Sequence, residues 1–361
     1  MGGQYCGLEE EPAGRRSVVI WFRADGGPEI GMGHIRRCLS VAEELRELGE
    51  QPCFLVADDA AVPLLKAQGQ DYRVLNSSWQ KPEEELKTLL PMLRESGRGV
   101  FLADSYYVTA EYLRQVGELM PVCCMDDMGI SGLPVDLLIN YNIYATLSLY
   151  TSSAGKTEYL LGTQYAPLRR EFQNAYQPIR EKAEKVLITT GGGDRYNLAG
   201  QILENALQTP ETRELEYCVV SGPYNQYLPQ LMELEQSHEN VHIHKNVTHM
   251  SELMQSCDIA VTAGGSTMYE LCAVGVPMLC FSFVDNQEKI VEGFKEQEVV
   301  CFGGNYLTQK ERMIPLVTEQ IAVLYNSVGL RRTSSEKGRQ LVDGQGAGRI
   351  AKRLCELTKL S

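Results

Sequence analysis

The stretch that decides the fold is Asp258–Gln287, which reads DIAVTAGGSTMYELCAVGVPMLCFSFVDNQ. It opens with a β-branched run that is typical of a buried parallel strand. The pair Gly264-Gly265 then permits a sharp turn and a close approach of the backbone to a ligand. Ser266 or Thr267 can cap the helix that follows, and Gly275 ends it before a second apolar strand. The stretch therefore predicts a strand, a turn, a helix and a strand in a parallel α/β sheet.

A glycine turn that leads into a helix start is suited to phosphate, because it presents backbone N–H groups and a partial positive charge. Glu270 lies one turn into the helix, where its carboxylate can reach a ribose hydroxyl. Asn286 and Gln287 follow the next strand at the same edge of the sheet and are expected to contact substrate. The alternative is a βαβ unit whose glycines only shape the turn. The order of the motifs favours a nucleotide site formed by Gly264, Gly265, Ser266, Thr267 and Glu270.

The composition predicts a protein with a large hydrophobic core and no nucleic-acid partner. The 361 residues suffice for two α/β domains, and 43% of them are hydrophobic. The formal net charge of −13 disfavours nucleic acid as a partner. The 11 cysteines are unpatterned and include no Cys-x-x-Cys pair, which indicates reduced thiols and a cytoplasmic location. No apolar run is long enough to span a bilayer, so no membrane association is expected.

Two successive α/β alternations divide the chain. Residues 1–16 have no signal-peptide core and are expected to form a disordered or loosely attached extension. An N-terminal sugar-binding and catalytic domain is predicted over 17–175, a polar linker over 173–184, and a C-terminal nucleotide-binding domain over 183–361. The predicted fold class is α/β, with two Rossmann-like domains that face a central cleft holding the ligand.

The loop between the first strand and the first helix contains Gly31-Met32-Gly33-His34. Its glycines let the loop pass close to a substrate, so Gly33 is a candidate substrate contact. His34 would face the cleft at a helix start, which disfavours the imidazolium form and leaves a ring able to accept a proton. His34 is the predicted catalytic base, with an exposed or capping histidine as the alternative. Asp25, in the same loop, is expected to orient the ring or bind the sugar, or else to be a turn residue.

Other polar residues follow predicted strands at the carboxyl edge, where open parallel sheets bind ligands. Asp104, Tyr106 and Asn140 are candidate contacts for the acetamido or hydroxyl groups of a sugar, with turn chemistry as the alternative. In the second half, Gly192, Gly193 and Asp194 follow a strand as a phosphate loop would, with a plain βα turn as the alternative. Arg36 and Arg37 could meet phosphate or sugar, although most helical arginines are solvated.

Two possible metal sites are set aside. Asp126 and Asp127 are consecutive at a strand end, so their side chains point apart and a shared metal would need further ligands. The second candidate is a group of four histidines within one short stretch, namely His238, His242, His244 and His249. This group lacks the cysteine or helical His-x-x-x-His pair that would complete a zinc site. We therefore predict exposed histidines, no metal and no cofactor.

The ordered motifs resemble the nucleotide-binding half of GT-B-fold enzymes that use UDP-sugars. Over 21–287 they resemble the UDP-sugar hydrolase family of the pseudaminic-acid pathway, which is close to the spore-coat polysaccharide proteins. Residues 1–16 and 26–28 depart from that family's pattern. The segments that carry the resemblance are Arg23-Ala-Asp25, Ile30–Leu39, Asp104-Ser-Tyr106, Asp126-Asp127, Asn140, Tyr165–Arg169, Gly191–Asp194, Ala263–Thr267, Glu270 and Asn286-Gln287.

The resemblance implies a hydrolase that cleaves a UDP-linked 2,4-diacetamido-2,4,6-trideoxy hexose to free sugar and UDP, in nonulosonic (pseudaminic) acid or related polysaccharide biosynthesis. His34 matches the catalytic histidine of the family. It would activate water against the anomeric carbon with inversion, while the C-terminal domain holds UDP. We expect a monomer whose partner is the UDP-sugar.

Two alternatives stay open. One is a metal-independent UDP-sugar glycosyltransferase, in which an acceptor hydroxyl replaces water. A lipid-linked acceptor would need an apolar or basic run near the N-terminal cleft, and the sequence shows no such run. The other is a nucleotide-sugar-binding protein without turnover.

Overall fold

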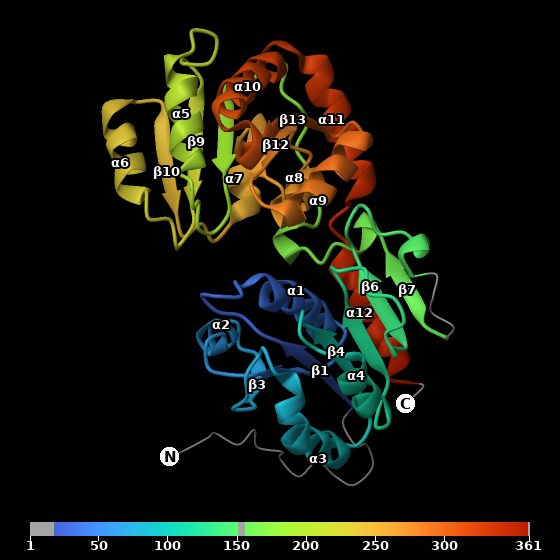
Figure 1. Ribbon diagram of the computed structural model, residues 1–361. Coiled ribbons are helices and arrows are strands. Elements are labelled where there is room, and N and C mark those ends of the chain that lie inside the picture. The colour runs from blue at the N-terminus through green and yellow to red at the C-terminus, as the bar shows by residue number, and fades with distance from the viewer. Residues whose placement is uncertain (1–17, 151–155, 360–361) are drawn as a thin grey trace. The chain divides into compact units, whose positions relative to one another are not determined.

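The computed structural model describes residues 18–150 and 156–359 (Figure 1). By their internal contacts these residues form two compact units. Unit 1 extends to Arg169 and resumes at Gln345, and unit 2 is Arg170–Gly344. The extension predicted over 1–16 lies outside the described residues.

Unit 1 is built on a seven-stranded parallel sheet with the strand order β3-β2-β1-β4-β5-β6-β7. The central strands β1 and β4 are buried along almost their whole length, which explains their nearly continuous hydrophobic sequences. The strands are β1 (Val19–Ala24), β2 (Pro52–Val56), β3 (Asp71–Val74), β4 (Gly99–Asp104), β5 (Val122–Met125), β6 (Leu137–Asn140) and β7 (Glu158–Leu161).

Helices cover both faces of this sheet (Figure 1). Helices α1, α2 and α12 share one hydrophobic core with the sheet, and α3 and α4 share the other. Each presents an apolar stripe to the sheet at helical spacing. Their bounds are α1 (Gly33–Glu47), α2 (Val62–Ala67), α3 (Leu86–Ser96), α4 (Ala110–Gly117) and α12 (Gly346–Leu357), with short 3₁₀ helices η1 (Pro82–Glu85), η2 (Leu147–Tyr150) and η3 (Thr163–Tyr165).

Helix α12 belongs to unit 1 although it follows all of unit 2 in the sequence. A Cβ on Gly346 would stand 2.2 Å from the carbonyl oxygen of Ala166, so glycine permits the close approach at the start of the helix. The boundary predicted at 183–361 therefore differs from the structure at its C-terminal end, because the apolar face of α12 completes the core of unit 1. The buried residues of this face are Ala347, Ile350, Ala351, Leu354 and Leu357.

Unit 2 has a six-stranded parallel sheet with the order β10-β9-β8-β11-β12-β13. Its strands are β8 (Lys185–Thr189), β9 (Glu216–Ser221), β10 (Val241–Lys245), β11 (Ile259–Ala263), β12 (Met278–Ser282) and β13 (Val300–Asn305). Helices α5, α6 and α10 share one core with the sheet, while α8 and α9 contact β11 and β12. The helices are η4 (Arg170–Phe172), α5 (Leu198–Gln208), α6 (Leu228–Ser237), α7 (Met250–Ser256), α8 (Ser266–Val274), α9 (Asp285–Glu296), α10 (Tyr306–Asn326) and α11 (Val328–Leu341).

The two α/β units agree with the predicted fold class. The strand–turn–helix–strand prediction for 258–287 is confirmed by β11, α8 and β12. The periodicity of the sequence does not predict α6, α9, α11 or β13. Within the described residues, no helix combines the length and apolar character needed to cross a membrane.

In each sheet the strand order reverses at one point, between β1 and β4 in unit 1 and between β8 and β11 in unit 2. Open α/β sheets bind ligands at the carboxyl ends of the strands that flank such a point. The loop that follows β1 leads to His34, and β4 ends at Asp104. The glycine loops 191–193 and 264–265 follow β8 and β11. The topology therefore selects one candidate site in each unit.

Candidate active site

His34 is placed by the loop between β1 and α1. Gly27 and Gly31 exchange backbone hydrogen bonds of 3.0 and 2.8 Å, and Gly31 has a φ of +79°, which glycine adopts at little cost. This turn leads into α1, which begins at the exposed Gly33. His34 follows in the first turn with only 5% of its side chain exposed. The alternative of an exposed histidine is therefore wrong.

Asp104 holds the imidazole from the neighbouring strand. Strands β1 and β4 pair, with Ala24 opposite Asp104. Nδ1 of His34 lies 2.6 Å from Oδ1 of the fully buried Asp104. Because a carboxylate accepts, Nδ1 carries the hydrogen and Nε2 is left as the basic nitrogen. This pair fixes the tautomer that a general base requires.

Arg37 keeps Asp104 charged. Its Nε donates to Oδ2 of Asp104 at 2.6 Å, and one of its terminal nitrogens also donates to Oδ1. Burial alone would raise the pKa of Asp104, but the charge and hydrogen bonds of Arg37, together with His34, hold that pKa well below its usual range. An ionised carboxylate beside Nδ1 stabilises the positive charge that His34 gains when it takes up a proton.

The sequence offers two environments for Arg37, a phosphate or sugar contact and bulk solvent, and the structure places it at the pocket beside His34, in contact with two carboxylates. Its side chain is 10% exposed, and its second terminal nitrogen donates to Asp127 at 2.7 Å and to the Tyr141 hydroxyl at 3.1 Å. Burial alone would lower the pKa of Arg37, but Asp104, Tyr141 and Asp127 raise it well above its usual value. Residues three apart share a helix face, and Arg37 follows His34 by three residues. The sequence therefore contains a sign that these two side chains lie together.

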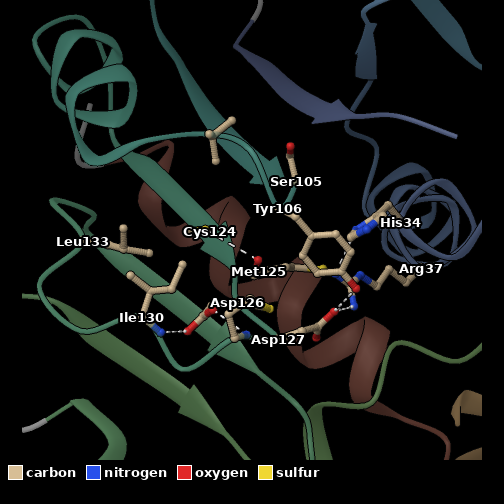
Figure 2. Close-up of a pocket in the computed structure, with 12 residues that line it drawn as sticks. His34, Arg37, Ser105, Tyr106, Cys124, Met125, Asp126, Asp127, Ile130 and Leu133 are labelled. Atoms are coloured by element: carbon tan, nitrogen blue, oxygen red, sulfur yellow. Dashed lines mark hydrogen bonds and ion pairs between the residues drawn. The ribbon is translucent and has the colours of Figure 1, made fainter. Parts of the chain in front are cut away.

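A pocket adjoins His34 at the carboxyl edge of the sheet (Figure 2). Its cavity volume is about 20 Å³, which is room for about one water molecule. The Tyr106 ring meets the imidazole edge-on, with 4.5 Å between the centroids, and its hydroxyl lies 3.5 Å from Asp127. Burial, and then the charge of Asp127, raise the pKa of Tyr106, so its phenol stays protonated and can donate. A base, a hydroxyl donor and a carboxylate are thus gathered at one pocket.

Asp126 and Asp127 have separate roles. Oδ1 of Asp126 accepts from the backbone N–H groups of Met128 and Gly129, at 2.8 and 3.1 Å. Its Oδ2 accepts from the N–H of Ile130 and from the Tyr150 hydroxyl, at 2.9 and 2.8 Å. Asp126 therefore folds the loop after β5 around itself, and Asp127 is the carboxylate that reaches the pocket.

Three predicted substrate contacts lie inside unit 1 and hold other protein groups. Asp104 is one of them, as described above. Asn140 is fully buried, donates to the Tyr150 hydroxyl at 2.8 Å and accepts from the backbone N–H of Asn142 at 3.1 Å. Asp25 pairs with Arg23 and accepts from the N–H of Ala57 at 2.7 Å. The carboxylate and amide groups of these three residues support the loops at the sheet edge, because each forms hydrogen bonds with a neighbouring strand, helix or loop.

Asp25 forms part of a buried ionic network beneath the His34 loop. Arg23 also donates to Glu85 at 2.6 and 3.0 Å, and Glu85 accepts from the Tyr112 hydroxyl at 2.6 Å. The sequence offers Asp25 as one candidate to orient the imidazole, and in the structure Asp104 makes that contact.

In unit 2, α8 begins without a side-chain cap. Gly265 is its N-cap residue, and the prediction that Ser266 or Thr267 caps it is wrong, because both already lie in the first turn. A Cβ on Gly264 would meet Val291 at 2.8 Å and Gln287 at 2.9 Å, so glycine is needed for α9 to pack there. The N–H groups of this first turn are arranged as in helix starts that bind phosphate. Glu270 lies further along α8 and is half-buried.

The start of α5 differs, because a carboxylate already caps it. Asp194 accepts from the backbone N–H groups of Leu198 and Ala199, at 2.7 and 3.1 Å. Burial raises the pKa of Asp194, and these two hydrogen bonds oppose that rise. Gly192 and Gly193 are exposed in the same loop. Asp194 therefore caps a helix, and a diphosphate at this helix start would meet its negative charge.

Asn286 and Gln287 lie in the first turn of α9. Gln287 Oε1 accepts from the backbone N–H of Phe283 at 3.0 Å, so this side chain closes the turn after β12. Among the described residues, no group of three or more His, Cys, Asp or Glu side chains could hold a metal ion. Nε2 of His242 lies 3.3 Å from a carboxylate oxygen of Glu216.

The comparisons with known proteins agree with this architecture. Residues 185–325 match the glycosyltransferase family 28 C-terminal domain, a range that runs from β8 into α10. The structure is similar to the crystal structure of MurG from Acinetobacter baumannii, with a TM-score of 0.65 and 15% sequence identity over 94% of this chain and 99% of that one. That similarity confirms the GT-B fold expected from the sequence.

Three relatives are similar in sequence. The chain is 27% identical over 347 residues to the spore coat polysaccharide biosynthesis protein SpsG of Bacillus subtilis, covering 92% of this chain and 97% of the relative. It is 25% identical over 277 residues to the UDP-2,4-diacetamido-2,4,6-trideoxy-beta-L-altropyranose hydrolase of Campylobacter jejuni, covering 75% and 94%. A 28% match to an uncharacterised protein of Methanocaldococcus jannaschii covers 73% of this chain but spans only 55% of that relative's length.

The chain therefore has a GT-B fold, with a region in unit 2 that matches the glycosyltransferase family 28 C-terminal domain, and it is a distant relative of proteins of nucleotide-sugar and polysaccharide biosynthesis.

Proposed function

We propose that the protein hydrolyses a UDP-linked 2,4-diacetamido-2,4,6-trideoxy hexose to the free sugar and UDP. The observation that carries the proposal is the His34–Asp104–Arg37 arrangement beside a pocket at the switch point of unit 1. The nucleotide-sugar part is supported by the family 28 match in unit 2 and by the name of the Campylobacter jejuni relative.

In the proposed reaction Nε2 of His34 takes a proton from water as the water oxygen bonds to the anomeric carbon. The bond from that carbon to the glycosidic oxygen breaks, and UDP leaves with the electron pair. The Asp104 carboxylate at 2.6 Å stabilises the imidazolium formed on His34. A base held in this way contributes roughly a hundred- to ten-thousandfold in rate. The chemistry requires neither a metal nor a cofactor.

Unit 2 would hold the nucleotide. The uncapped start of α8, with Gly264, Gly265, Ser266 and Thr267, suits the diphosphate, and its dipole stabilises the charge that develops on UDP. Glu270 would accept from a ribose hydroxyl. The exposed Gly192 and Gly193 could add backbone N–H donors, whereas Asp194 caps the helix and is left out of the proposed nucleotide site.

A second candidate is a UDP-sugar glycosyltransferase with an apolar acceptor. The sequence shows no apolar run near the catalytic histidine, but the structure gathers separate apolar side chains there. Met128 and Ile130 at the pocket are exposed, as are Leu147 and Leu149 on η2. The Ser131 hydroxyl donates to the carbonyl of Leu149 at 2.7 Å, so the two segments lie side by side. An apolar acceptor could bind such a surface.

The deciding experiment is to incubate the protein with a panel of UDP-sugars, with and without lipid and alcohol acceptors, and to follow UDP release. A hydrolase releases UDP and free sugar in buffer alone. A transferase releases UDP only when an acceptor is present, and the product carries the sugar. Binding of UDP without any release would support a nucleotide-sugar-binding protein and contradict the proposal.

A further inference from the structure

The pocket beside His34 has the size and the lining of a site for a single water molecule. Its volume is about 20 Å³, and roughly 10–15 Å³ is enough for one water. A water held inside a protein also needs about two to four polar partners. His34, Tyr106 and Asp127 line one side of this pocket, and Ile130 and Leu133 line the other (Figure 2).

Two acceptors in the pocket are available to the hydrogens of that water. One is Nε2 of His34, the nitrogen that remains basic because Nδ1 is bonded to a carboxylate. The other is Asp127, which accepts from Arg37 at 2.7 Å and from Asn142 at 3.2 Å. The Tyr106 hydroxyl lies 3.5 Å from the same carboxylate. A carboxylate has about four acceptor positions, and 20% of this side chain is exposed, so one position is left for a ligand.

The loop after β5 forms a wall that offers the water no hydrogen bond. The backbone N–H groups of residues 128–130 all donate to Asp126. This loop therefore presents side chains to the pocket and no backbone donors, and Val108 and Leu133 extend the apolar lining. A water held here through its two hydrogens keeps a lone pair of its oxygen for the anomeric carbon.

We propose that Asp127 selects water, and not an alcohol, as the attacking nucleophile. Water has two hydrogens, so one is taken by Nε2 of His34 and the other is held by Asp127. An alcohol has a single hydroxyl hydrogen, and its alkyl group would face the Asp127 carboxylate in a pocket that has no room for it. This assignment rests on the proposed function and adds to it the reason why the sugar is transferred to water.

The second hydrogen stays on the nucleophile throughout the step. The water oxygen bonds to the anomeric carbon while the bond from that carbon to the UDP oxygen breaks. One proton passes to His34, and UDP leaves with the electron pair. The second hydrogen remains on the new hydroxyl of the sugar, still donated to Asp127, which gains no proton. Asp127 therefore determines specificity, and His34 is the base.

The test is a competition between water and methanol for one substrate. The UDP-linked 2,4-diacetamido-2,4,6-trideoxy hexose is incubated with the protein in water–methanol mixtures, and mass spectrometry measures the ratio of methyl glycoside to free sugar. In the wild type this ratio should lie about 10- to 200-fold below the molar ratio of methanol to water, the usual discrimination for one additional methylene in a fitted pocket. A ratio of two products does not depend on the amount of folded protein, so a purely structural loss would not change it.

Variants that widen the pocket show whether it is responsible. Asp127→Ala should raise the methyl glycoside ratio about tenfold or more, whereas Asp127→Asn keeps the size of the side chain and should still exclude methanol. Ile130→Ala widens the pocket from its apolar side and repeats the test if Asp127→Ala does not fold. Leu48→Ala is the matched control, since Leu48 is 47% exposed and Ile130 43%, and Leu48 lies at the end of α1 outside the pocket lining.

A crystal structure provides a measurement that does not depend on turnover. The wild type should show one ordered water between Nε2 of His34 and the Asp127 carboxylate, and Asp127→Ala should lose it. Such a water in a protein that releases UDP from no sugar would support the water site and contradict the proposed function.

The assignment is overturned if the wild type captures methanol in proportion to its concentration, or if neither Asp127→Ala nor Ile130→Ala raises the ratio. Either result, in a protein that releases UDP and free sugar in buffer alone, would leave the proposed function in place.

Discussion

Asp104 is the side chain on which the geometry around His34 depends, since one of its oxygens meets the imidazole and both meet the guanidinium of Arg37. The sequence places Asp104 correctly at a strand end but predicts the wrong use for it. Strand ends can be located from hydrophobic runs, whereas the neighbour of each strand cannot. Only the order β1-β4 brings Asp104 to the loop of His34 and makes a predicted sugar contact into a hydrogen-bond partner of that imidazole.

His34→Ala should lower turnover by roughly 100- to 10,000-fold, because a positioned general base is lost. Affinity for UDP should stay nearly unchanged, because the proposed nucleotide residues all belong to unit 2. Steady-state UDP release and calorimetry with UDP check the two parts. Arg36→Ala, an exposed neighbour on α1, is the control and should keep full activity. A His34→Ala variant with more than about a tenth of the wild-type rate would exclude His34 as the base.

Asp104→Asn should alter the acid stability of unit 1. The folded pKa of Asp104 lies below the unfolded value of about 3.9. Its contribution to stability is therefore fully present above about pH 5 and is lost as the pH falls toward the folded pKa. The free energy of unfolding should fall more steeply from pH 5 downward in the wild type than in Asp104→Asn.

Tryptophan fluorescence during urea unfolding measures this change in unit 1 alone, because the chain has two tryptophans, Trp21 and Trp79, and both lie there. Asp71→Asn, which replaces an exposed carboxylate, is the control and should follow the wild type. Parallel pH profiles for wild type and Asp104→Asn would show that Arg37 does not hold the Asp104 pKa down.

At the scale of elements, two glycine loops that look alike in the sequence differ by one capping carboxylate. Both follow a strand at the switch point of unit 2, and both precede a helix. Asp194 caps α5, whereas no side chain caps α8. The sequence alone could not separate them, because Asp194 lies four residues before Leu198 and its backbone has a positive φ of 39°. The conformation of the loop, and not its composition, determines which helix start is available to phosphate.

Asp194→Ala should destabilise unit 2 by about 0.5–2 kcal/mol, the usual effect of removing a helix cap. UDP affinity should not fall, because the carboxylate contacts only the helix in this arrangement. Thermal unfolding and calorimetry with UDP give the two values. A large loss of UDP affinity in a stable variant would indicate that Asp194 contributes to the nucleotide site.

Gly264→Ala should both destabilise unit 2 and weaken UDP binding, because the new Cβ would clash with Val291 and Gln287 and push α9 from the turn. Overpacking of this kind costs about 1–3 kcal/mol. Gly329→Ala is the matched control, since a Cβ there meets nothing within 4 Å. Thermal unfolding followed by circular dichroism, with and without UDP, compares the two variants. Equal behaviour would mean that the packing at Gly264 is not needed for the site.

Elements with strong apolar periodicity are predictable from the sequence, and those without it are not. Helix α11 buries Arg331, Ser335 and Gly338, so its inward face is not apolar. Strand β13 contains Gly303 and Gly304, which weaken the strand pattern. Strands β1, β4, β8 and β11 carry nearly continuous hydrophobic runs, which make them recognisable in the sequence.

For the whole molecule, the proposed mechanism determines which bond breaks. Water activated by His34 attacks carbon, so hydrolysis in ¹⁸O-labelled water should place the label in the sugar and none in UDP. A single displacement also inverts the anomeric centre. Mass spectrometry of both products and early proton spectra of the sugar measure these outcomes. Label in UDP would mean attack at phosphorus, and retention of configuration would require a covalent intermediate.

Two α/β domains can be predicted from the alternation of strands and helices, but the return of the chain to unit 1 cannot. The last helix is amphipathic, and an amphipathic helix packs equally well on any sheet with an uncovered apolar face. Sequence position suggests unit 2, while the buried face from Ala347 to Leu357 completes the core of unit 1.

Because α12 belongs to unit 1, synthesis of unit 2 is finished before synthesis of unit 1. A ribosome completes all of Arg170–Gly344 before it adds the helix that the first sheet needs. Unit 2 can therefore reach its native state while the nascent unit 1 still exposes the apolar side of α1 where α12 will pack. Throughout that interval the unfinished first unit presents a hydrophobic surface to chaperones, and the core beside α1, the helix that carries His34, is complete only when residues 345–357 have emerged.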